Sequence, residues 1–444
     1  MLAMLHLYRK WLRCIAIGKS TGFALMGIAI VVRLHREAME LNARFVKGGD
    51  STKGSFCKKS KGDHGMDEKL SHLSAEEVKT LRNRYYQGES TNKLIKEYGI
   101  SARPNNLYKL FPPEEVEEFC EYCGVQLVRN CVSKSAYQWR NDSDIYCPVC
   151  GHKPHVHCRC ENCIHEEQEL ADFQRMLIEA AYSQNRPAVK LSELTFEQRV
   201  FLGTLCWGLG DENMSIKPYN GANVILTPTD DLRSQVYESL NRDDIITVSP
   251  ASPLTAFEAE DENFPYRYFV YEVQYSLNLA IETTKEELFS KILNPTCYPF
   301  NREEALQLWK KIAIAECLEY LGLQLHRVSF PFHPGDKTYK MFEILLDDFS
   351  VAQIYGIIWR AVAEASKLYL ERERVLSKKH AANTVIGFCE RYAGRAKANG
   401  WTLKGYNRPR ELPQSTLSSF FYNRVLGIGD AGFECCPTID KLSG

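Results

Sequence analysis

The feature that most constrains this chain is a set of cysteines gathered in one short segment. Three Cys-x-x-Cys pairs occur there: Cys120/Cys123, Cys147/Cys150 and Cys160/Cys163. Glycine follows the first two pairs directly, as Gly124 and Gly151, and glycine at that position permits a tight turn that aims backbone N–H groups at a thiolate. Four sulfurs from two such turns suit the tetrahedral coordination of Zn²⁺. The spacing therefore predicts a zinc site.

Two other interpretations of the cysteines are less consistent with the sequence. Disulfide frameworks belong mainly to small secreted domains, whereas this chain has 444 residues and 44% hydrophobic residues, and Cys206, Cys317 and Cys389 stand singly in apolar helical patterns. A redox Cys-x-x-Cys is expected once, where a strand meets a helix, and not three times in a loop-rich segment. Metal binding is the interpretation that explains the repetition.

The third pair leaves the ligand sets open. With Cys158 it lies among histidines, so three sulfurs and one imidazole could hold a second zinc; these histidines are His152, His155, His157 and His165. Alternatively, Cys160 and Cys163 replace one of the earlier pairs. Cys131 stands alone, and we expect it to be a packed thiol. The candidate zinc ligands are Cys120, Cys123, Cys147, Cys150, Cys158, Cys160 and Cys163.

Residues 1–65 differ in character from the rest of the chain. Their apolar run, Phe23 to Val32, is too short to span a membrane, and no small-residue signal-peptide cleavage site follows it. Lys61-Gly62-Asp63 can be encoded by a purine-rich ribosome-binding sequence just ahead of a start codon at Met66. We therefore expect residues 1–65 to be a mis-called leader or disordered, and the protein to be bacterial and cytoplasmic, with no membrane partner.

Behind this segment, helix signals recur at short intervals. Ser74 and Glu77 form a capping box before a helix that stops at Gly88. A second helix is expected to end at Gly99, and a third to run from about residue 101 until Pro112. Three short helices with a glycine turn before the third predict a helix-turn-helix in residues 66–113.

The stretch from Tyr86 to Ser101 resembles the helix-turn-helix of resolvases and transposases, in which the turn glycine corresponds to Gly99. The resemblance implies a third helix in the major groove of double-stranded DNA. That family usually continues with serine or threonine and a basic residue, whereas this chain has Arg103, Asn105, Asn106, Tyr108 and Lys109. Arginine and asparagine are side chains that read guanine and adenine edges. The cations that could contact phosphates are Lys79, Arg82, Arg84, Lys93 and Lys96.

Residues 114–166 are expected to form a zinc ribbon, and basic and aromatic side chains alternate between its two cysteine turns. They are Arg129, Lys134, Tyr137, Trp139 and Arg140. Such a mixture suits a nucleic-acid backbone with splayed bases, but the same residues could form the small core of the ribbon. The net charge of −1 shows that any basic surface must be local.

Residues 167–282 combine helix and strand signals. We expect a helix over Thr195–Gly208, a helix start at Thr227–Asp231, and strands at Ile245–Val248 and Tyr266–Leu279. Helices followed by two strands are consistent with a winged helix, which would be a second DNA-contacting module. A small α+β scaffold without a ligand fits the same signals.

Residues 283–444 are expected to form a helical domain. Amphipathic patterns predict helices over Asn301–Leu321, Ser350–His380 and Ala381–Ala398. A basic loop, Lys404–Arg410, follows and could lie on the surface or meet a phosphate.

Motifs of known zinc enzymes are missing from the sequence. It has no His-Glu-x-x-His and no deaminase signature, and Asp336, Lys340 and Glu343 do not follow a known metal-nuclease spacing. We therefore predict an α+β, mainly helical multi-domain protein that binds DNA, as a regulator or as a recognition subunit of a mobile-element or defence system. A zinc-braced scaffold for a protein partner and a zinc-braced nuclease are the alternatives.

Overall fold

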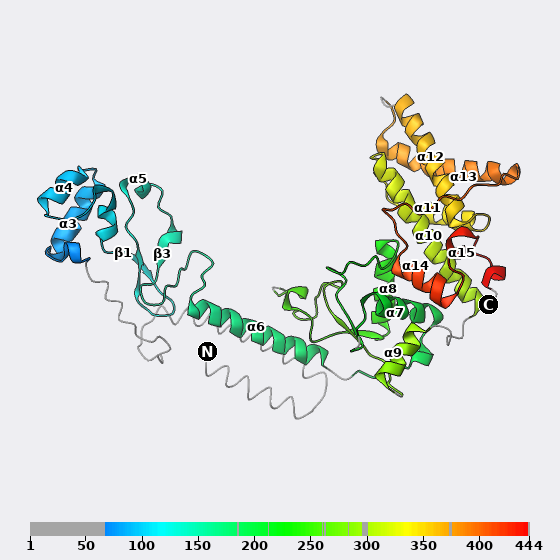
Figure 1. Ribbon diagram of the computed structural model, residues 1–444, viewed down its shortest axis with the longest axis horizontal. Coiled ribbons are helices and arrows are strands. Elements are labelled where there is room, and N and C mark those ends of the chain that lie inside the picture. The colour runs from blue at the N-terminus through cyan, green and yellow to red at the C-terminus, as the bar shows by residue number, and fades with distance from the viewer. Residues whose placement is uncertain are drawn as a thin grey trace. The chain divides into compact units, whose positions relative to one another are not determined.

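The computed structural model describes residues 67–183, 186–211, 213–259, 261, 263–282, 284–294, 301–372 and 375–442. The predicted leader, residues 1–65, lies outside the described residues. Within the described residues the protein is mainly helical with two small antiparallel sheets, which confirms the α+β class (Figure 1). It divides into two compact units, Met1–His165 and Glu166–Gly444. Among the described helices, none has the length and apolarity needed to cross a bilayer.

The first two predicted helices of the first unit are present. After the short η1 (Glu68–Leu70), α3 (Ala75–Tyr86) begins at the capping box, where the Ser74 N–H donates to the Glu77 carboxylate over 2.8 Å and the Glu77 N–H donates to Ser74 Oγ over 3.3 Å. The next helix is α4 (Thr91–Glu97). Gly88 and Gly99 follow the two helices with φ angles of 94° and 61°, a conformation that ends helices and favours glycine.

The third predicted helix is a short 3₁₀-helix, η2 (Pro104–Leu110), and not an α-helix. Its buried residues, Leu107 and Leu110, are three apart, which matches the three-residue turn of a 3₁₀-helix. They pack into one core with α3 and α4. This orientation leaves the polar residues of η2 exposed.

A three-stranded antiparallel sheet follows, in the order β1-β2-β3. Its strands are β1 (Glu114–Phe119), β2 (Gln126–Arg129) and β3 (Ile145–Tyr146). One cysteine turn connects β1 to β2, and the other follows β3. The segment between β2 and β3 carries α5 (Lys134–Tyr137) and η3 (Asp142–Asp144). Helix α6 (Glu161–Tyr182) begins at the third cysteine pair.

The segment between β2 and β3 packs against the helices. Cys131 is buried in the helical core, as expected of a packed thiol. The Tyr86 hydroxyl donates to the Val132 carbonyl over 2.8 Å, and the ring of Tyr86 lies 4.2 Å from that of Tyr137. Arg140 donates to Tyr86 Oη over 3.2 Å. The predicted modules 66–113 and 114–166 therefore share an extensive interface.

The second unit begins with an α+β part. Its elements are η4 (Leu191–Glu193), α7 (Phe196–Leu209), β4 (Ser215–Ile216), α8 (Asp230–Arg242), β5 (Ile246–Val248), η5 (Leu254–Ala256) and β6 (Tyr275–Leu277), with sheet order β4-β6-β5. Helix α7, the start of α8 and strand β5 confirm the sequence signals. The predicted strand Tyr266–Leu279 is wrong except for its end, because the Phe269 carbonyl accepts turn bonds from the N–H groups of Glu272 and Val273.

The rest of the second unit is helical. Its helices are α9 (Lys285–Leu293), α10 (Arg302–Arg327), α11 (Asp336–Leu346), α12 (Val351–Glu371), α13 (Lys378–Ala398), α14 (Thr416–Ser419), the π-helical η7 (Phe420–Val425), α15 (Ala431–Glu434) and η8 (Ile439–Leu442). Helix α10 starts at Asn301 as predicted. The single helix predicted over Ser350–His380 is wrong: α12 ends at Glu371, and Ser377 caps α13 by accepting from the His380 N–H.

Candidate metal centres

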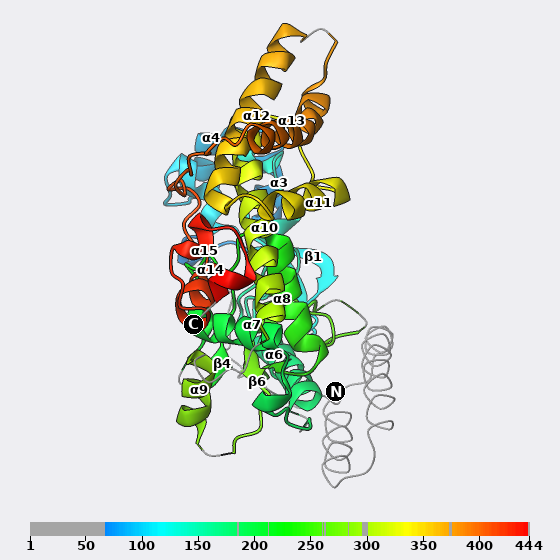
Figure 2. The same cartoon turned by 90° about the vertical axis from the view of Figure 1, so that its right-hand side faces the viewer.

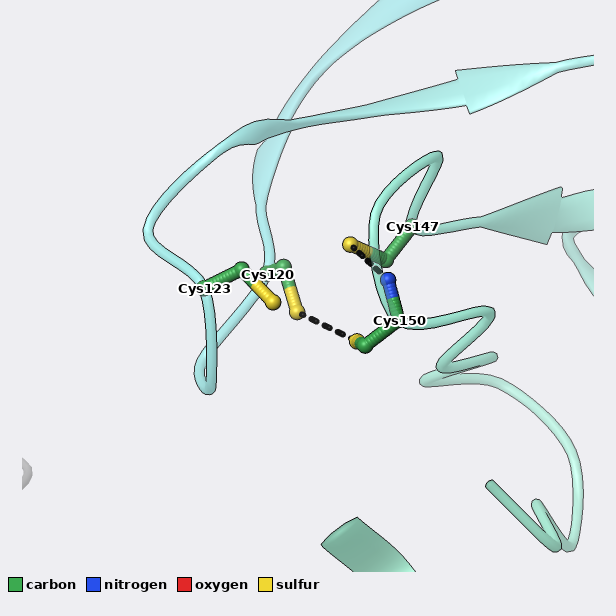
Figure 3. Close-up of side chains that lie close together, drawn as sticks. All are labelled: Cys120, Cys123, Cys147 and Cys150. Carbon is green, nitrogen blue, oxygen red and sulfur yellow. Dashed lines mark hydrogen bonds between the residues drawn. The ribbon is translucent and has the colours of Figure 1, made fainter. Parts of the chain in front are cut away.

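The first two cysteine pairs come together as one cluster. The sulfurs of Cys120, Cys123, Cys147 and Cys150 all lie within 4.8 Å of one another. Figure 3 shows two sulfurs arriving from the turn after β1 and two from the turn after β3. The Sγ atoms of Cys120 and Cys150 are 3.7 Å apart, close to the roughly 3.8 Å that tetrahedral metal–sulfur bonds of about 2.3 Å imply. These four residues could hold a metal ion.

The glycines explain the geometry of both turns. Gly124 and Gly151 have φ angles of 66° and 72°, and a Cβ at either would meet no atom within 4 Å. Glycine is therefore favoured by backbone conformation and not by lack of space. The N–H groups of Val149 and Cys150 lie 3.4 and 3.5 Å from Cys147 Sγ. The turn thus points two donors at a sulfur, as the sequence predicted.

Burial and hydrogen bonding act in opposite directions on the thiols of this cluster. Burial raises the pKa of Cys120, and it raises the pKa of Cys150 to about 12. Burial also opposes ionisation of Cys147, but the N–H groups of Cys150 and Val149, together with the thiols of Cys150 and Cys120, outweigh it and lower the pKa of that thiol. A bound cation would favour the thiolate at all four sulfurs. Because the four protein ligands complete a tetrahedron, the cluster suits a structural ion and not a catalytic one.

A second cluster consists of His152, Cys158, Cys160 and Cys163, again with ligand atoms within 4.8 Å of one another. His152 Nδ1 lies 3.2 Å from Cys163 Sγ and 4.0 Å from Cys160 Sγ. The structure therefore selects His152 from the four candidate histidines, and Cys160 and Cys163 do not replace an earlier pair. His155 Nε2 instead lies 2.9 Å from a Glu118 carboxylate oxygen.

The first cysteine turn also supports the second cluster. Glu121 and Tyr122 lie between Cys120 and Cys123, yet both reach the other site. Glu121 Oε1 is 3.2 Å from His152 Nε2, a close contact without hydrogen-bond alignment, and a carboxylate beside the outer ring nitrogen is the usual way to orient a metal-bound histidine. The Tyr122 hydroxyl lies 3.6 Å from Cys163 Sγ. The two clusters are therefore structurally linked.

All six residues predicted to contact DNA are exposed: Lys93, Lys96, Arg103, Asn105, Asn106 and Lys109. Lys93 Nζ lies 3.3 Å from Glu89 Oε1, and Lys109 lies over the Tyr108 ring at 6.0 Å. Two other arginines that were predicted to contact phosphates instead lie beside carboxylates of the first unit. Arg84 binds Glu89 and Glu97, each at 2.6 Å, and Arg82 lies 4.0 Å from Glu114.

The three cations predicted between the cysteine turns all have partners inside the first unit. Arg129 binds Asp142 at 2.9 Å, and Arg140 binds Glu114 at 2.6 Å. Lys134 donates to the Glu89 carbonyl and lies over the Tyr85 ring at 4.6 Å. The three cations thus stabilise the unit itself. The two aromatic residues of this group are exposed, Trp139 with 82% and Tyr137 with 42% of its surface.

Sequence reasoning missed a buried ionic cluster in the second unit. Glu316 of α10 is fully buried, and its Oε1 accepts from Arg408 over 2.8 Å and from Ser418 Oγ over 2.6 Å. Arg408 belongs to the basic loop Lys404–Arg410, so this member of the loop points inward and not to a phosphate. The one sequence signal was a glutamate on the apolar face of a helix. Burial raises the pKa of Glu316, against the opposing effects of Arg408 and Ser418.

Across the described residues, three or more metal-binding side chains meet only at the two cysteine clusters. Asp336, Lys340 and Glu343, considered for a nuclease, lie exposed along α11. Comparison of the chain with protein-family models, with curated proteins and with solved structures finds no match.

Proposed function

We propose that this protein is a zinc-containing DNA-binding protein in which residues 67–113 act as a helix-turn-helix and residues 114–165 as a zinc ribbon. The observation that carries the proposal is the surface of η2. Arg103, Asn105 and Asn106 are exposed, and their side chains make no hydrogen bond or ion pair within the described residues. Side chains of these types are free to reach base edges in a groove.

The donor sets favour zinc in both clusters. One offers four sulfurs and the other three sulfurs and one imidazole, which are common ligand sets of structural Zn²⁺. The metal would stabilise the segment between β2 and β3, and that segment packs on α3 through Tyr86. Zinc in this proposal braces the DNA-contacting helices and does not take part in chemistry.

Removing a phosphate contact and removing a base contact should change DNA binding in different ways. Replacing Lys96 with alanine should weaken binding to all duplexes alike and flatten its salt dependence, because that lysine would neutralise a phosphate. Arg103→Ala or Asn106→Ala should cost about 1–3 kcal/mol at particular base pairs only. Electrophoretic mobility shifts on a selected duplex library, at several salt concentrations, measure both effects.

Lys291→Ala, an exposed lysine of α9 in the second unit, is the matched control and should bind as the unaltered protein does. If the unaltered protein shows no salt-sensitive binding to duplex DNA at low ionic strength, the DNA-binding proposal fails.

The second cluster makes a separate prediction. His152→Ala should lower the zinc content from two ions per chain to one, because the three remaining sulfurs hold the metal weakly. His155→Ala should keep both ions, since His155 contacts Glu118 and belongs to neither cluster. Metal analysis of the purified proteins measures the difference. Two ions retained in His152→Ala would contradict the ligand set.

The winged-helix alternative adds no DNA-contacting surface to the proposal. Helix α8 would be the groove-reading helix, yet it exposes Asp230, Asp231 and Glu238. Arg233 is held by Asp230 at 2.9 Å. Three exposed carboxylates against the exposed cation Arg242 disfavour contact with phosphates, so residues 167–282 fit a scaffold better.

A zinc-braced protein-interaction scaffold remains the second candidate, because the sheet module of the first unit exposes large apolar side chains. Trp139 is 82% exposed and Phe119 is 65% exposed. Exposed apolar groups of this size occur at protein-docking surfaces. Binding of duplex DNA separates the two candidates.

A further inference from the structure

The second unit carries a surface of aromatic and basic side chains that neither metal site explains. We define it by six residues: Trp359, Arg360, Tyr392, Trp401, Lys404 and Tyr406. They come from α12, from α13 and from the loop that follows α13. Helices α12 and α13 pack against each other and are adjacent in both views (Figure 1 and Figure 2).

The loop is held against α12 by specific contacts. The Tyr406 N–H donates to the Ala352 carbonyl over 2.8 Å, and Gln353 Nε2 donates to the Leu403 carbonyl over 3.0 Å. A Cβ at Gly356 would lie 3.3 Å from the Tyr406 ring, so the absence of a side chain there lets the ring approach the helix. The aromatic side chains are therefore positioned by the fold.

Two tryptophans of this surface face solvent. Trp359 is 48% exposed and lies 6.2 Å from the Tyr406 ring, and Trp401 is 47% exposed and lies 6.1 Å from the Tyr392 ring. Arg360 lies 5.0 Å above Tyr392. Half-exposed rings supported by a second ring are platforms on which a flat ligand can stack.

The cations of this surface lack acidic partners. Arg360 and Lys404 are exposed and make no ion pair within the described residues, and the same holds for Arg410 further along the loop. By contrast, Lys397 at the end of α13 binds Asp348 at 2.6 Å. Since the chain as a whole has a net charge of −1, unpaired cations beside these aromatic rings mark a local site for an anion.

We propose that this surface binds single-stranded nucleic acid, with bases stacked on Trp359 and Trp401 and phosphates held by Arg360 and Lys404. Flat rings and unpaired cations together match a ligand that alternates bases and phosphates. A duplex does not offer its base faces, and the centre of a protein interface is usually depleted of charge. The inference concerns residues remote in sequence from η2 and does not depend on duplex binding there.

The test uses the full chain and dye-labelled oligothymidylate and oligouridylate, followed by fluorescence anisotropy. Trp359→Ala and Trp401→Ala should each weaken binding roughly 5- to 100-fold, because each removes a stacking partner. Phenylalanine at either position should restore part of the loss, and Lys404→Gln should flatten the salt dependence. Leu370→Ala, a 72% exposed residue of α12, is the control and should change nothing.

Three results would overturn the inference. The first is unchanged oligonucleotide binding in the folded double variant Trp359→Ala/Trp401→Ala. The second is no binding by the unaltered protein at low salt, which would leave the surface to a protein partner. The third is loss of oligonucleotide binding in Arg103→Ala alone, which would place the strand on the first unit and leave the proposed function standing without this second site. Circular dichroism of each variant checks its fold.

Discussion

Cys147→Ser is expected to remove the metal from the four-sulfur cluster and to unfold the sheet of the first unit. Three sulfurs cannot complete the tetrahedron, and binding of structural zinc contributes about 10–16 kcal/mol to the folding of small zinc modules. Residues 114–165 should become sensitive to protease, while the second unit stays folded around its own core. Metal analysis and limited proteolysis with mass spectrometry measure both outcomes.

Because the two clusters are linked, the loss of one metal ion should affect the other. Glu121 and Tyr122 belong to the first cysteine turn and contact ligands of the second cluster. Cys147→Ser should therefore lose both ions, whereas His152→Ala should lose one. Cys131→Ala is the control, because Cys131 packs in the helical core and belongs to neither cluster. Full metal occupancy in Cys147→Ser would count against the assignment.

Glu316→Gln is expected to destabilise the second unit by about 3–5 kcal/mol, because it leaves the charge of Arg408 buried without its partner. Arg408 retains only 17% exposure of its side chain, and Glu316 has none. The amide oxygen of the variant could still accept from Ser418 Oγ. The loss of stability therefore measures the ion pair and not this hydrogen bond. Urea unfolding, followed by tryptophan fluorescence, to which the buried Trp309 contributes, measures the change.

Two variants make this prediction specific. Asp347→Asn breaks the exposed ion pair with Lys310 and should cost no more than about 1 kcal/mol. The double variant Glu316→Leu/Arg408→Met should recover most of the stability lost in Glu316→Gln, because paired apolar side chains can replace a buried ion pair. A Glu316→Gln protein as stable as the unaltered one would show that Arg408 finds another partner or reaches water.

Local signals in the sequence were sufficient where local chemistry decides the structure. Glycine after a Cys-x-x-Cys pair requires only its own backbone conformation, and Gly124 and Gly151 adopt it. The capping box of Ser74 and Glu77 is likewise made within one turn of helix. The start of α10 at Asn301 follows for the same reason.

The spacing of apolar residues did not predict the structure correctly where two kinds of structure fit the same pattern. The aromatic alternation over Tyr266–Leu279 fits a strand, but Tyr271 packs against the rings of Tyr219 and Tyr237 from a turn. The apolar period of α12 does not reveal where the helix stops, because the charged residues after Glu371 suit a helix and a loop equally well. Leucines three apart in η2 fit both kinds of helix.

The candidate ligands, the cysteine turns that present them and the polar residues of η2 could be predicted from the sequence. The ligand sets could not, because three cysteine pairs allow several pairings, and it is the sheet that brings the first two pairs together in one cluster. Tertiary contacts also place His152, and not the neighbouring histidines, beside the cysteines of the second cluster. They likewise bury Arg408 against Glu316. These choices depend on contacts between residues far apart in the chain, which local spacing does not encode.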